Sequence, residues 1–293
     1  MEEPILALVD SSLYWKSVCD LAIWASKELN APIRLLNVLD KMSEDAAIPA
    51  DIAKDIDKRF YTDFLGGIHD DNASYARLMQ ELGQTVLDNA KAYIEKHTKN
   101  AVDTKLRYDS LDEAIRFYGK KSSLIVIGKQ GQKTVNKTQQ SEVGGNFETI
   151  IRASPKPVLA ATINAGPIDK ALLIYDDDFE LDLAIRYIRQ YPLFTNKTIY
   201  IAFSKYAFKT VSEDVDRIIK QLDEEGVQAS ALLLEDDRDG EGINRIVDEN
   251  EVDMIILSAF NKAKIKKLIF GSFHKTLIQK IKVPALIIGN PTD

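Results

Sequence analysis

Two distant stretches of this chain follow the same pattern. Each begins with a glycine, continues through a helix-like segment, and reaches a proline and a short apolar run 13 positions after the glycine. Gly144 and Pro157 mark the first stretch, and Gly271 and Pro284 mark the second. The intervening residues differ, whereas the spacing is the same. Equal spacing at two places indicates an internal duplication, so we expect two units of similar fold.

Composition agrees with two globular units and excludes several classes of protein. A length of 293 residues suits two domains, and 45% hydrophobic residues let each domain bury a core. The net charge of −7 leaves no broad basic face, so a nucleic-acid partner is not expected. No apolar run approaches the roughly 20 residues of a membrane span. The amino terminus lacks a basic region before an apolar one, so we expect no signal peptide and a cytoplasmic location.

Both halves alternate short apolar runs with helical periodicity. Such runs are typical of strands covered on both faces, and intervening helices make the sheet parallel. The strands expected in the first half are residues 5–9, 33–39, 102–108, 124–127 and 158–161. Those expected in the second half are residues 171–175, 198–203, 227–234, 254–257 and 285–288. The predicted fold class is α/β, with two doubly wound five-stranded parallel sheets in domains 1–163 and 168–293.

The halves differ mainly in a polar stretch near residues 40–81, which has no counterpart in the second half. Stretches of this length are usually functional or structural elaborations. One interpretation is a lid or partner-binding arm over a first pocket, and the alternative is a helical elaboration that covers the sheet or the other domain. Helices are expected at residues 18–29, 82–94, 111–118, 146–152, 211–222, 243–247 and 272–281, and one more follows residues 176–178 and ends at residue 188.

Polar residues and glycines follow the strands at which a ligand would bind. In doubly wound sheets, ligands lie beyond the carboxyl ends of the strands, where the winding direction reverses. Asp10 follows the first strand, Gly128 and Gly131 follow the fourth, and residues 144–146 open the next helix. Glycines let the backbone approach a phosphate, and a helix N-terminus offers N–H groups to it. A carboxylate accepts hydrogen bonds from a ribose hydroxyl or an adenine amino group, so the combination predicts a nucleotide pocket.

At these positions the chain resembles the universal stress protein family in its tandem form. That family has a G-x2-G-x9-G-[S/T] loop after the fourth strand and an aspartate at the end of the first. Tandem members commonly carry the stretch G-S-N-x-E-x-[V/I]-[V/I]-R-A in their first domain. Residues 144–153 match it, except that Gly145 stands at the serine position. The resemblance covers essentially the whole chain.

The resemblance implies a strand order of 3-2-1-4-5 in each sheet and ATP, with Mg²⁺, as the ligand. It also implies that the fifth strands, residues 158–161 and 285–288, pair with each other and join the halves into an internal pseudo-dimer. The cofactor-binding residues expected from it are Asp10, Val38, Gly128, Gly131, Gly144, Gly145 and Asn146 in the first half, and Asp176, Gly271 and Ser272 in the second.

Both copies of the loop depart from the family pattern. In the first, twelve residues rather than nine separate Gly131 from Gly144. In the second, nine residues precede Gly271, but Ser258 and Asn261 replace the two early glycines. Asparagine tolerates a left-handed backbone better than most residues, whereas serine adds a side chain where a phosphate needs room. Each pocket keeps part of the signature, and the first is favoured because it keeps both early glycines.

Three other groups have both a functional and a structural interpretation. The functional interpretation of the lysines in residues 262–267 is that they neutralise a triphosphate, and the structural interpretation is that they form a solvated helix face. One interpretation of the aspartates of residues 176–178 is a metal site. In the favoured interpretation, Asp176 is the aspartate that the family has at the end of the first strand, and the other two cap the next helix and place charge in its first turn. Val38 and Phe203, on the second strand of each half, line an adenine site or pack in the core.

Residues for conventional catalysis are few. The histidines are His69, His97 and His274, and none has a predicted carboxylate partner or full metal-ligand set. The nucleophile-elbow, P-loop and metalloprotease motifs do not occur. Cys19, the only cysteine, excludes an intramolecular disulfide and is expected to be a small buried hydrophobic residue rather than a redox thiol. No catalytic residue and no metal site are predicted.

Two functions compete, and a third is disfavoured. In the first, one pocket binds ATP or another adenine nucleotide, and the bound state alters an interaction surface in a stress response. In the second, both pockets have lapsed and the chain is a nucleotide-free scaffold that acts through protein partners. The third is slow ATP hydrolysis, for which the sequence shows no base or metal set. The protein partner cannot be identified from the sequence, and a homodimer is compatible with it.

Overall fold

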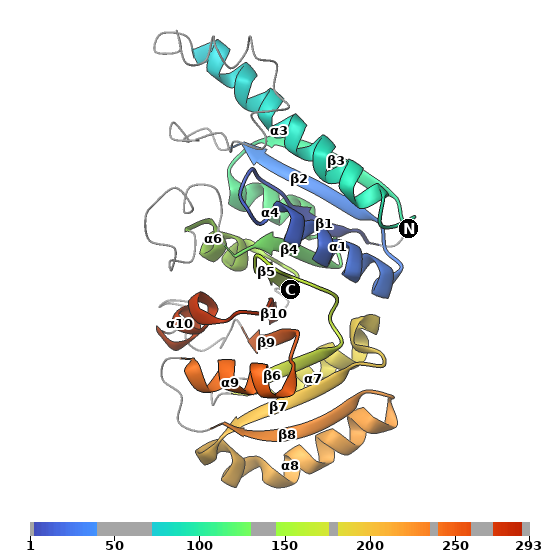
Figure 1. Cartoon of the computed structure of the whole chain (residues 1–293), viewed down its shortest axis with the longest axis vertical. Coiled ribbons are helices and arrows are strands. Elements are labelled where there is room, and N and C mark those ends of the chain that lie inside the picture. Colours follow the sequence, from blue (N-terminus) through green and yellow to red (C-terminus); the bar gives the residue numbers. More distant parts are fainter. Residues whose placement is uncertain are drawn as a thin grey trace.

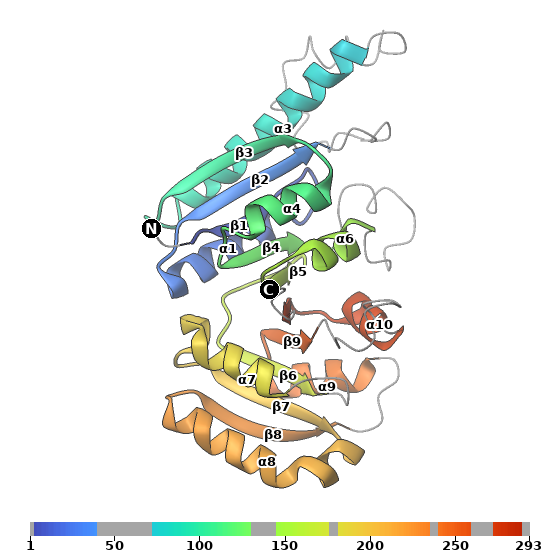
Figure 2. The ribbon, with the colours of Figure 1, turned by 180° about the vertical axis from the view of Figure 1, so that it is seen from behind.

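The computed structural model describes residues 3–39, 72–129, 145–175, 181–234, 240–258 and 272–288. Within these ranges the strands form one ten-stranded sheet, and helices cover both of its faces (Figures 1 and 2). The strand order is β3-β2-β1-β4-β5-β10-β9-β6-β7-β8. The molecule is long in the direction in which the strands succeed one another, so the two halves of the chain occupy opposite ends (Figure 1).

The first half of the sheet consists of strands β1 to β5. They are β1 (Ile5–Leu8), β2 (Ile33–Leu39), β3 (Val102–Tyr108), β4 (Leu124–Gly128) and β5 (Val158–Ala161). The helices described in this half are α1 (Trp15–Leu29), α3 (Asn72–Glu95), α4 (Leu111–Gly119) and α6 (Gly145–Ala153).

The second half repeats this alternation. Its strands are β6 (Lys170–Tyr175), β7 (Thr198–Ser204), β8 (Gln228–Leu234), β9 (Met254–Ser258) and β10 (Ala285–Ile288). Its described helices are α7 (Leu181–Gln190), the short 3-10 helix η1 (Pro192–Phe194), α8 (Lys205–Glu224), α9 (Glu241–Asn250) and α10 (Ser272–Lys280).

The α/β class with parallel sheets is confirmed, but several helices are longer than predicted, α3 and α8 by the most. α3 begins at Asn72 rather than at residue 82, and α8 begins at Lys205 rather than at residue 211. Leu78 and Leu82 of α3 are buried in the core. The later part of the predicted insertion therefore continues a core helix, and its polar residues concealed this in the sequence. Residues 40–71 of the insertion lie outside the described residues.

Pairing is parallel within each half, whereas the two halves meet through an antiparallel pair. β5 lies beside β10 so that Val158 is opposite Ile287 and Leu159 is opposite Leu286. All residues of both strands are buried. Each strand would otherwise present unpaired N–H and C=O groups at a sheet edge. The two predicted five-stranded sheets are thus halves of one continuous sheet.

Alternate residues of the strands face two separate apolar cores. On β1, Ile5 and Ala7 belong to the core under α1, α3, α7 and α8, whereas Leu6 belongs to the core under α4, α6, α9 and α10. The two-residue period follows from strand geometry. Because helices cover both faces, the central strands such as β1, β4, β5 and β10 are continuous apolar runs, whereas the edge strands β3 and β8 are partly exposed and include polar residues.

Side chains also join the halves away from the sheet. The side chain of Lys197, just before β7, is 11% exposed. Its ammonium nitrogen lies 2.9 Å from Oε1 of Glu28 in α1 and 3.0 Å from Oδ1 of Asp169. Ser17 of α1 donates a hydrogen bond to the carbonyl oxygen of Ile163 in the connector. The first helix thus contacts both the connector and the second half.

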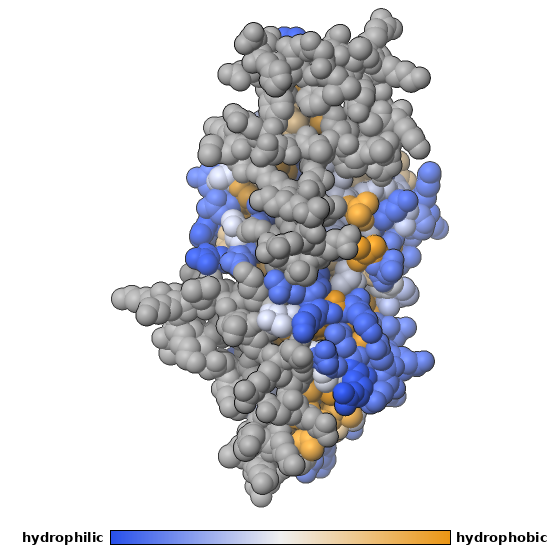
Figure 3. Space-filling view, turned by 60° about the vertical axis from the view of Figure 1, so that its left-hand side comes forward, coloured by the Kyte–Doolittle hydropathy of each residue, from blue (hydrophilic) through white to orange (hydrophobic). Residues whose placement is uncertain are grey.

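The face drawn in Figure 3 is mostly hydrophilic where it is described, with small, separate apolar areas. The exposed large hydrophobic side chains of the described residues are those of Leu13, Tyr108, Phe117, Ile163 and Leu233. They come from different parts of the fold. Among the described helices, none combines the length and the apolar character that crossing a bilayer requires.

Candidate functional site

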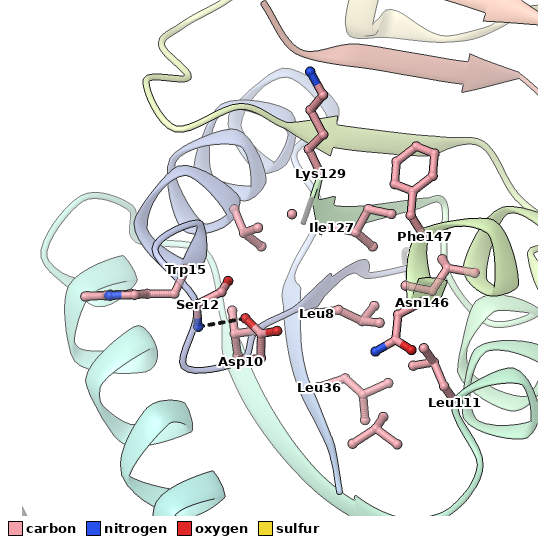
Figure 4. A pocket seen from close by; sticks show the side chains of 15 residues that line it. Leu8, Asp10, Ser12, Trp15, Leu36, Leu111, Ile127, Lys129, Asn146 and Phe147 are labelled. Carbon is pink, nitrogen blue, oxygen red and sulfur yellow. Dashed lines mark hydrogen bonds between the residues drawn. The ribbon is translucent and has the colours of Figure 1, made fainter. Parts of the chain in front are cut away.

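A cavity opens at the carboxyl ends of β1 and β4, where the sheet changes winding direction. From β1 the chain moves outward to β2 and β3, and then returns to β4 on the other side of β1. Ligands of doubly wound sheets bind in this kind of crevice. The cavity has a volume of about 90 Å³ and is lined by residues of β1, α1, β2, α4, β4 and α6 and of the turn before α1 (Figure 4).

Most of the side chains around the cavity are apolar. The apolar ones that face it from the sheet, α4 and α6 are Leu8, Leu36, Val38, Leu111, Ile127, Phe147 and Ile150. The polar ones are Asp10, Ser12, Lys129 and Asn146. An apolar surface with a few polar groups is the usual composition of a small-molecule site, in which the polar groups fix the ligand's orientation.

Asp10 is held in place by the turn that leads from β1 into α1. Its Oδ1 accepts a hydrogen bond from the main-chain N–H of Ser12 at 3.0 Å (Figure 4). This is the side-chain-to-backbone contact by which aspartate favours a turn. The hydroxyl of Ser12 in turn accepts a hydrogen bond from the N–H of Tyr14 at 3.4 Å, just before α1 begins. The carboxylate is therefore fixed at the mouth of the cavity by local sequence.

Lys129 contributes to the cavity wall but extends its ammonium group elsewhere. Its main-chain N–H donates to the carbonyl oxygen of Ala161 at 3.0 Å, which ties the end of β4 to β5. The ammonium nitrogen donates to the carbonyl oxygens of Gln279 at 2.9 Å and Ile281 at 3.0 Å. Figure 4 shows the side chain pointing away from the cavity toward the second half. Burial lowers the pKa of Lys129 to about 8, because removal from water disfavours the charged form.

The first turn of α6 closes another side of the cavity. α6 begins at Gly145, and the amide of Asn146 projects from it toward the cavity (Figure 4). The N–H groups of a first helical turn have no acceptor within the helix and carry the positive end of its dipole. A helix that starts at this point suits an anionic part of a ligand.

The structure brings four of the predicted cofactor-binding residues to one cavity, namely Asp10, Val38, Gly128 and Asn146. Gly145 and Ser272 are the first residues of α6 and α10. The remaining predicted positions, Gly131, Gly144, Asp176 and Gly271, lie outside the described residues. So do the lysines of residues 262–267. That these residues bind a nucleotide remains a prediction.

The favoured structural interpretations of several other residues agree with their surroundings. Phe203 is fully buried in the core, with its ring centre 5.3 Å from that of Tyr175. Cys19 is buried, and burial raises its pKa, which suits a small hydrophobic residue rather than a reactive thiol. The exposed ring of His97, just after α3, lies tilted against that of Tyr93 with the ring centres 4.6 Å apart. Within the described part of the chain, no group of three or more potential ligands is placed to hold a metal ion.

Sequence reasoning overlooked several lining residues. Leu111 and Phe147 fall within predicted helices, and Ser12 follows the predicted first strand, so the pattern does not mark them as ligand contacts. Their position beside the carboxyl ends of β1 and β4 was the signal available for finding them. The sequence pattern gives no indication of the role of Lys129, because its side-chain contact to Gln279 lies 150 residues away in the chain.

A larger depression of about 630 Å³ lies at the opposite edge of the sheet, lined in part by Glu3, Arg34 and Asp103. Arg34 already donates to both carboxylate oxygens of Asp103, at 2.8 to 3.1 Å. Glu3 is paired with Lys156 at 2.8 Å. Glu3, Arg34 and Asp103 are already paired, and the depression lies at the amino ends of the strands, so the smaller cavity at the carboxyl ends is the better candidate.

Comparison with known proteins identifies the family of this chain. A family model described as the universal stress protein family matches residues 1–161 and 196–289, which is most of the chain. The chain belongs to the universal stress protein family. A universal stress protein from Synechocystis sp. is 23% identical over 288 residues, which cover 96% of this chain and 98% of that protein.

Solved structures show that the fold of this universal stress protein is shared along its whole length. A universal stress protein from Archaeoglobus fulgidus superimposes with a TM-score of 0.69 at 16% identity, covering 99% of this chain and 97% of that one. A functionally unknown protein from Pseudomonas aeruginosa gives a TM-score of 0.58 at 13% identity, covering 98% and 92%. Both resemble the two halves together, which agrees with a tandem form.

Proposed function

We propose that this universal stress protein binds an adenine nucleotide, with ATP as the expected ligand, in the first-half cavity. In this proposal the protein acts as a ligand-responsive binding protein rather than as an enzyme. The observation that carries the proposal is the meeting of the Asp10 carboxylate, the end of β4 at Gly128 and the first turn of α6 around one cavity. Each supplies a different contact that a nucleotide needs.

The three groups match three parts of a nucleotide. The carboxylate of Asp10 is placed to accept hydrogen bonds from an adenine amino group or a ribose hydroxyl. The apolar surface around Leu36 and Val38 suits the face of a base. The positive end of α6 suits a phosphate. A cavity of about 90 Å³ is well below the roughly 300–1,000 Å³ of pockets for drug-sized ligands, so it encloses only part of the nucleotide.

One observation favours the second function, a nucleotide-free scaffold. Lys129 is the only cationic side chain among the described lining residues, and its ammonium is bound to the second half instead of facing the cavity. A site for a triphosphate would ordinarily use such a cation. In the scaffold interpretation the cavity is a remnant, and the protein acts through a protein partner.

Thermal unfolding in the presence of nucleotides separates the two functions. The full chain is heated with ATP, ADP, AMP or a cyclic nucleotide, with and without Mg²⁺. Ligand at 100 times its dissociation constant stabilises the folded state by roughly 2.7 kcal/mol. That corresponds to an increase in melting temperature of several degrees for a protein of this size. An unchanged melting temperature with millimolar amounts of every nucleotide would reject the proposed function.

Variants then locate the site. Asp10→Asn keeps a side-chain oxygen for the turn to Ser12 but removes the charge, and should abolish most of the nucleotide effect. Asp216→Asn, on an exposed position of α8, is the matched control and should leave it unchanged. If Asp176→Asn abolishes the effect and Asp10→Asn does not, the ligand site belongs to the second half instead.

A further inference from the structure

Lys129 joins the candidate cavity to the other half of the molecule. Its main chain belongs to the cavity wall at the end of β4, and its ammonium group is bound by two carbonyl oxygens beyond the β5–β10 boundary. The residue is only 8% exposed. One residue therefore contacts both the proposed ligand site and the second half.

A lysine is an unusual residue at a buried position whose only requirement is that a side chain fills the space. An apolar side chain of similar length would occupy the same volume without removing a charge from water. The lysine adds N–H donors at the end of a long stem, and the two acceptors recorded for them belong to the second half. A neutral amine still carries two N–H groups, so the two contacts do not require the charge.

Both acceptors lie at the carboxyl end of α10. Carbonyl groups in a last helical turn lack helical N–H partners and carry the negative end of the helix dipole, so a lysine is a favourable partner for them. At its other end α10 begins at Ser272, directly after the predicted second-half glycine, Gly271. One nine-residue helix therefore connects the anchor of Lys129 with the predicted loop of the second half.

We propose that Lys129 is a positioning residue that makes the first-half cavity depend on the second half. Its anchored stem fixes the end of β4 at Gly128 and Lys129, and these two residues form one wall of the cavity. A displacement of α10 therefore changes the wall, and a ligand that moves the wall displaces α10. The identity of that ligand rests on the proposed nucleotide function, whereas the mechanical link is a property of the protein without ligand.

A second buried lysine provides a matched control. Lys197 also joins the halves, through Glu28 and Asp169, and its side chain is 11% exposed. It does not line the cavity. Replacing either lysine by methionine removes the donors and keeps most of the stem. Lys129→Met and Lys197→Met both weaken contact between the halves, but only the first is expected to affect the cavity.

Hydrogen–deuterium exchange of the unliganded full chain tests the mechanical link. In Lys129→Met we expect amide exchange to accelerate by about fivefold in peptides from α10 and also in peptides from the cavity wall in β4 and α6, the size of effect expected from one lost hydrogen bond. In Lys197→Met these peptides should exchange as in the natural protein. Acceleration confined to α10 would overturn the proposal, and so would the same pattern in both variants.

Calorimetric titration with ATP tests the consequence for binding. Small displacements of positioning groups change binding and reactivity strongly, so we expect Lys129→Met to weaken ATP affinity by about tenfold or more. Lys197→Met should change it by less than about twofold, as expected for a site remote from the ligand. Equal affinities in the natural protein and Lys129→Met would overturn the positioning role.

The two measurements keep this inference separate from the proposed function. If the natural protein does not bind ATP, the nucleotide function fails, and the exchange comparison alone decides whether Lys129 positions the cavity wall. Circular dichroism establishes first that each variant is folded. If Lys129→Met does not fold, Lys129→Arg, which keeps donors but changes their geometry, is compared with Lys197→Arg in the same two experiments.

Discussion

The ammonium nitrogen of Lys129 lies 2.9 Å from the main-chain oxygen of Gln279, a residue 150 positions further along the chain. The contact places an ionisable group inside the boundary between the halves. Burial there lowers its pKa from the ordinary value of 10.5 to about 8. Because this pKa differs between the folded and unfolded states, proton binding by the amine is linked to stability.

We expect Lys129 to make the free energy of unfolding rise between pH 8 and pH 10.5. In this window the folded protein has released the proton and the unfolded chain still binds it, so raising the pH favours the folded state. Below pH 8 both states are protonated and the contribution is lost. The shift corresponds to at most about 3 kcal/mol. Urea unfolding of the natural protein and Lys129→Met at pH 7 and pH 9.5 measures it, and equal pH dependence in both would contradict it.

Gly83→Ala should destabilise the first half. A Cβ at Gly83 of α3 would lie 2.7 Å from Cδ1 of Leu106 and 3.0 Å from Oδ1 of Asn37. The ends of the Leu106 and Asn37 side chains would have to shift, and overpacking of this kind costs about 1–3 kcal/mol. Gly166→Ala is the control, because a Cβ there has no heavy atom within 4 Å. Chemical denaturation compares the two, and an unchanged stability of Gly83→Ala would show that the packing is looser than described.

Leu286→Ala should weaken the junction between the halves. Leu286 of β10 is fully buried opposite Leu159 of β5, so its truncation should lower the free energy of unfolding by about 2–5 kcal/mol. Leu233→Ala, at a residue that is 52% exposed, should change it by less than about 0.5 kcal/mol.

The same variant tests whether the halves unfold together. Both tryptophans, Trp15 and Trp24, are in the first half, so fluorescence reports on that half, whereas circular dichroism reports on the whole chain. We expect the two signals to have the same midpoint in the natural protein and different midpoints in Leu286→Ala. Coincident midpoints in the variant would mean that the junction is not what couples the halves.

Tyr93→Phe should lower stability by about 1 kcal/mol, since the Tyr93 hydroxyl donates to Oδ1 of Asp20 at 2.7 Å. The hydrogen bond to Asp20 is the main cause that raises the pKa of Tyr93 to about 12. This stabilisation is complete below pH 10, the ordinary value, and is lost as the pH rises through 12. Alkaline absorbance titration of the natural protein and Asp20→Asn measures it. An unaltered tyrosine titration in Asp20→Asn would argue against the contact.

The central strands could be predicted because burial on both faces makes each of them a continuous apolar run, as in β4 and β10. The first part of α3 could not, since its polar residues give little helical signal before Leu78 and Leu82. The meeting of Asp10, Gly128 and Asn146 follows from topology, which brings the carboxyl ends of β1 and β4 to one edge. The hydrogen bonds of the Lys129 ammonium could not be predicted from the sequence. Their acceptors are main-chain carbonyl oxygens, which any residue at those positions would provide.

The antiparallel junction of β5 with β10 relates the two halves as a two-fold axis relates the subunits of a dimer. In a dimer of identical subunits every contact is made twice. Here the residue that follows β9, at the position corresponding to Lys129, is Ala259, whose side chain has no amino group to donate a hydrogen bond. Because the two copies are fused into one chain, the sequence of each half can change independently of the other. The second half can therefore hold a residue of the first-half cavity in place without a reciprocal contact.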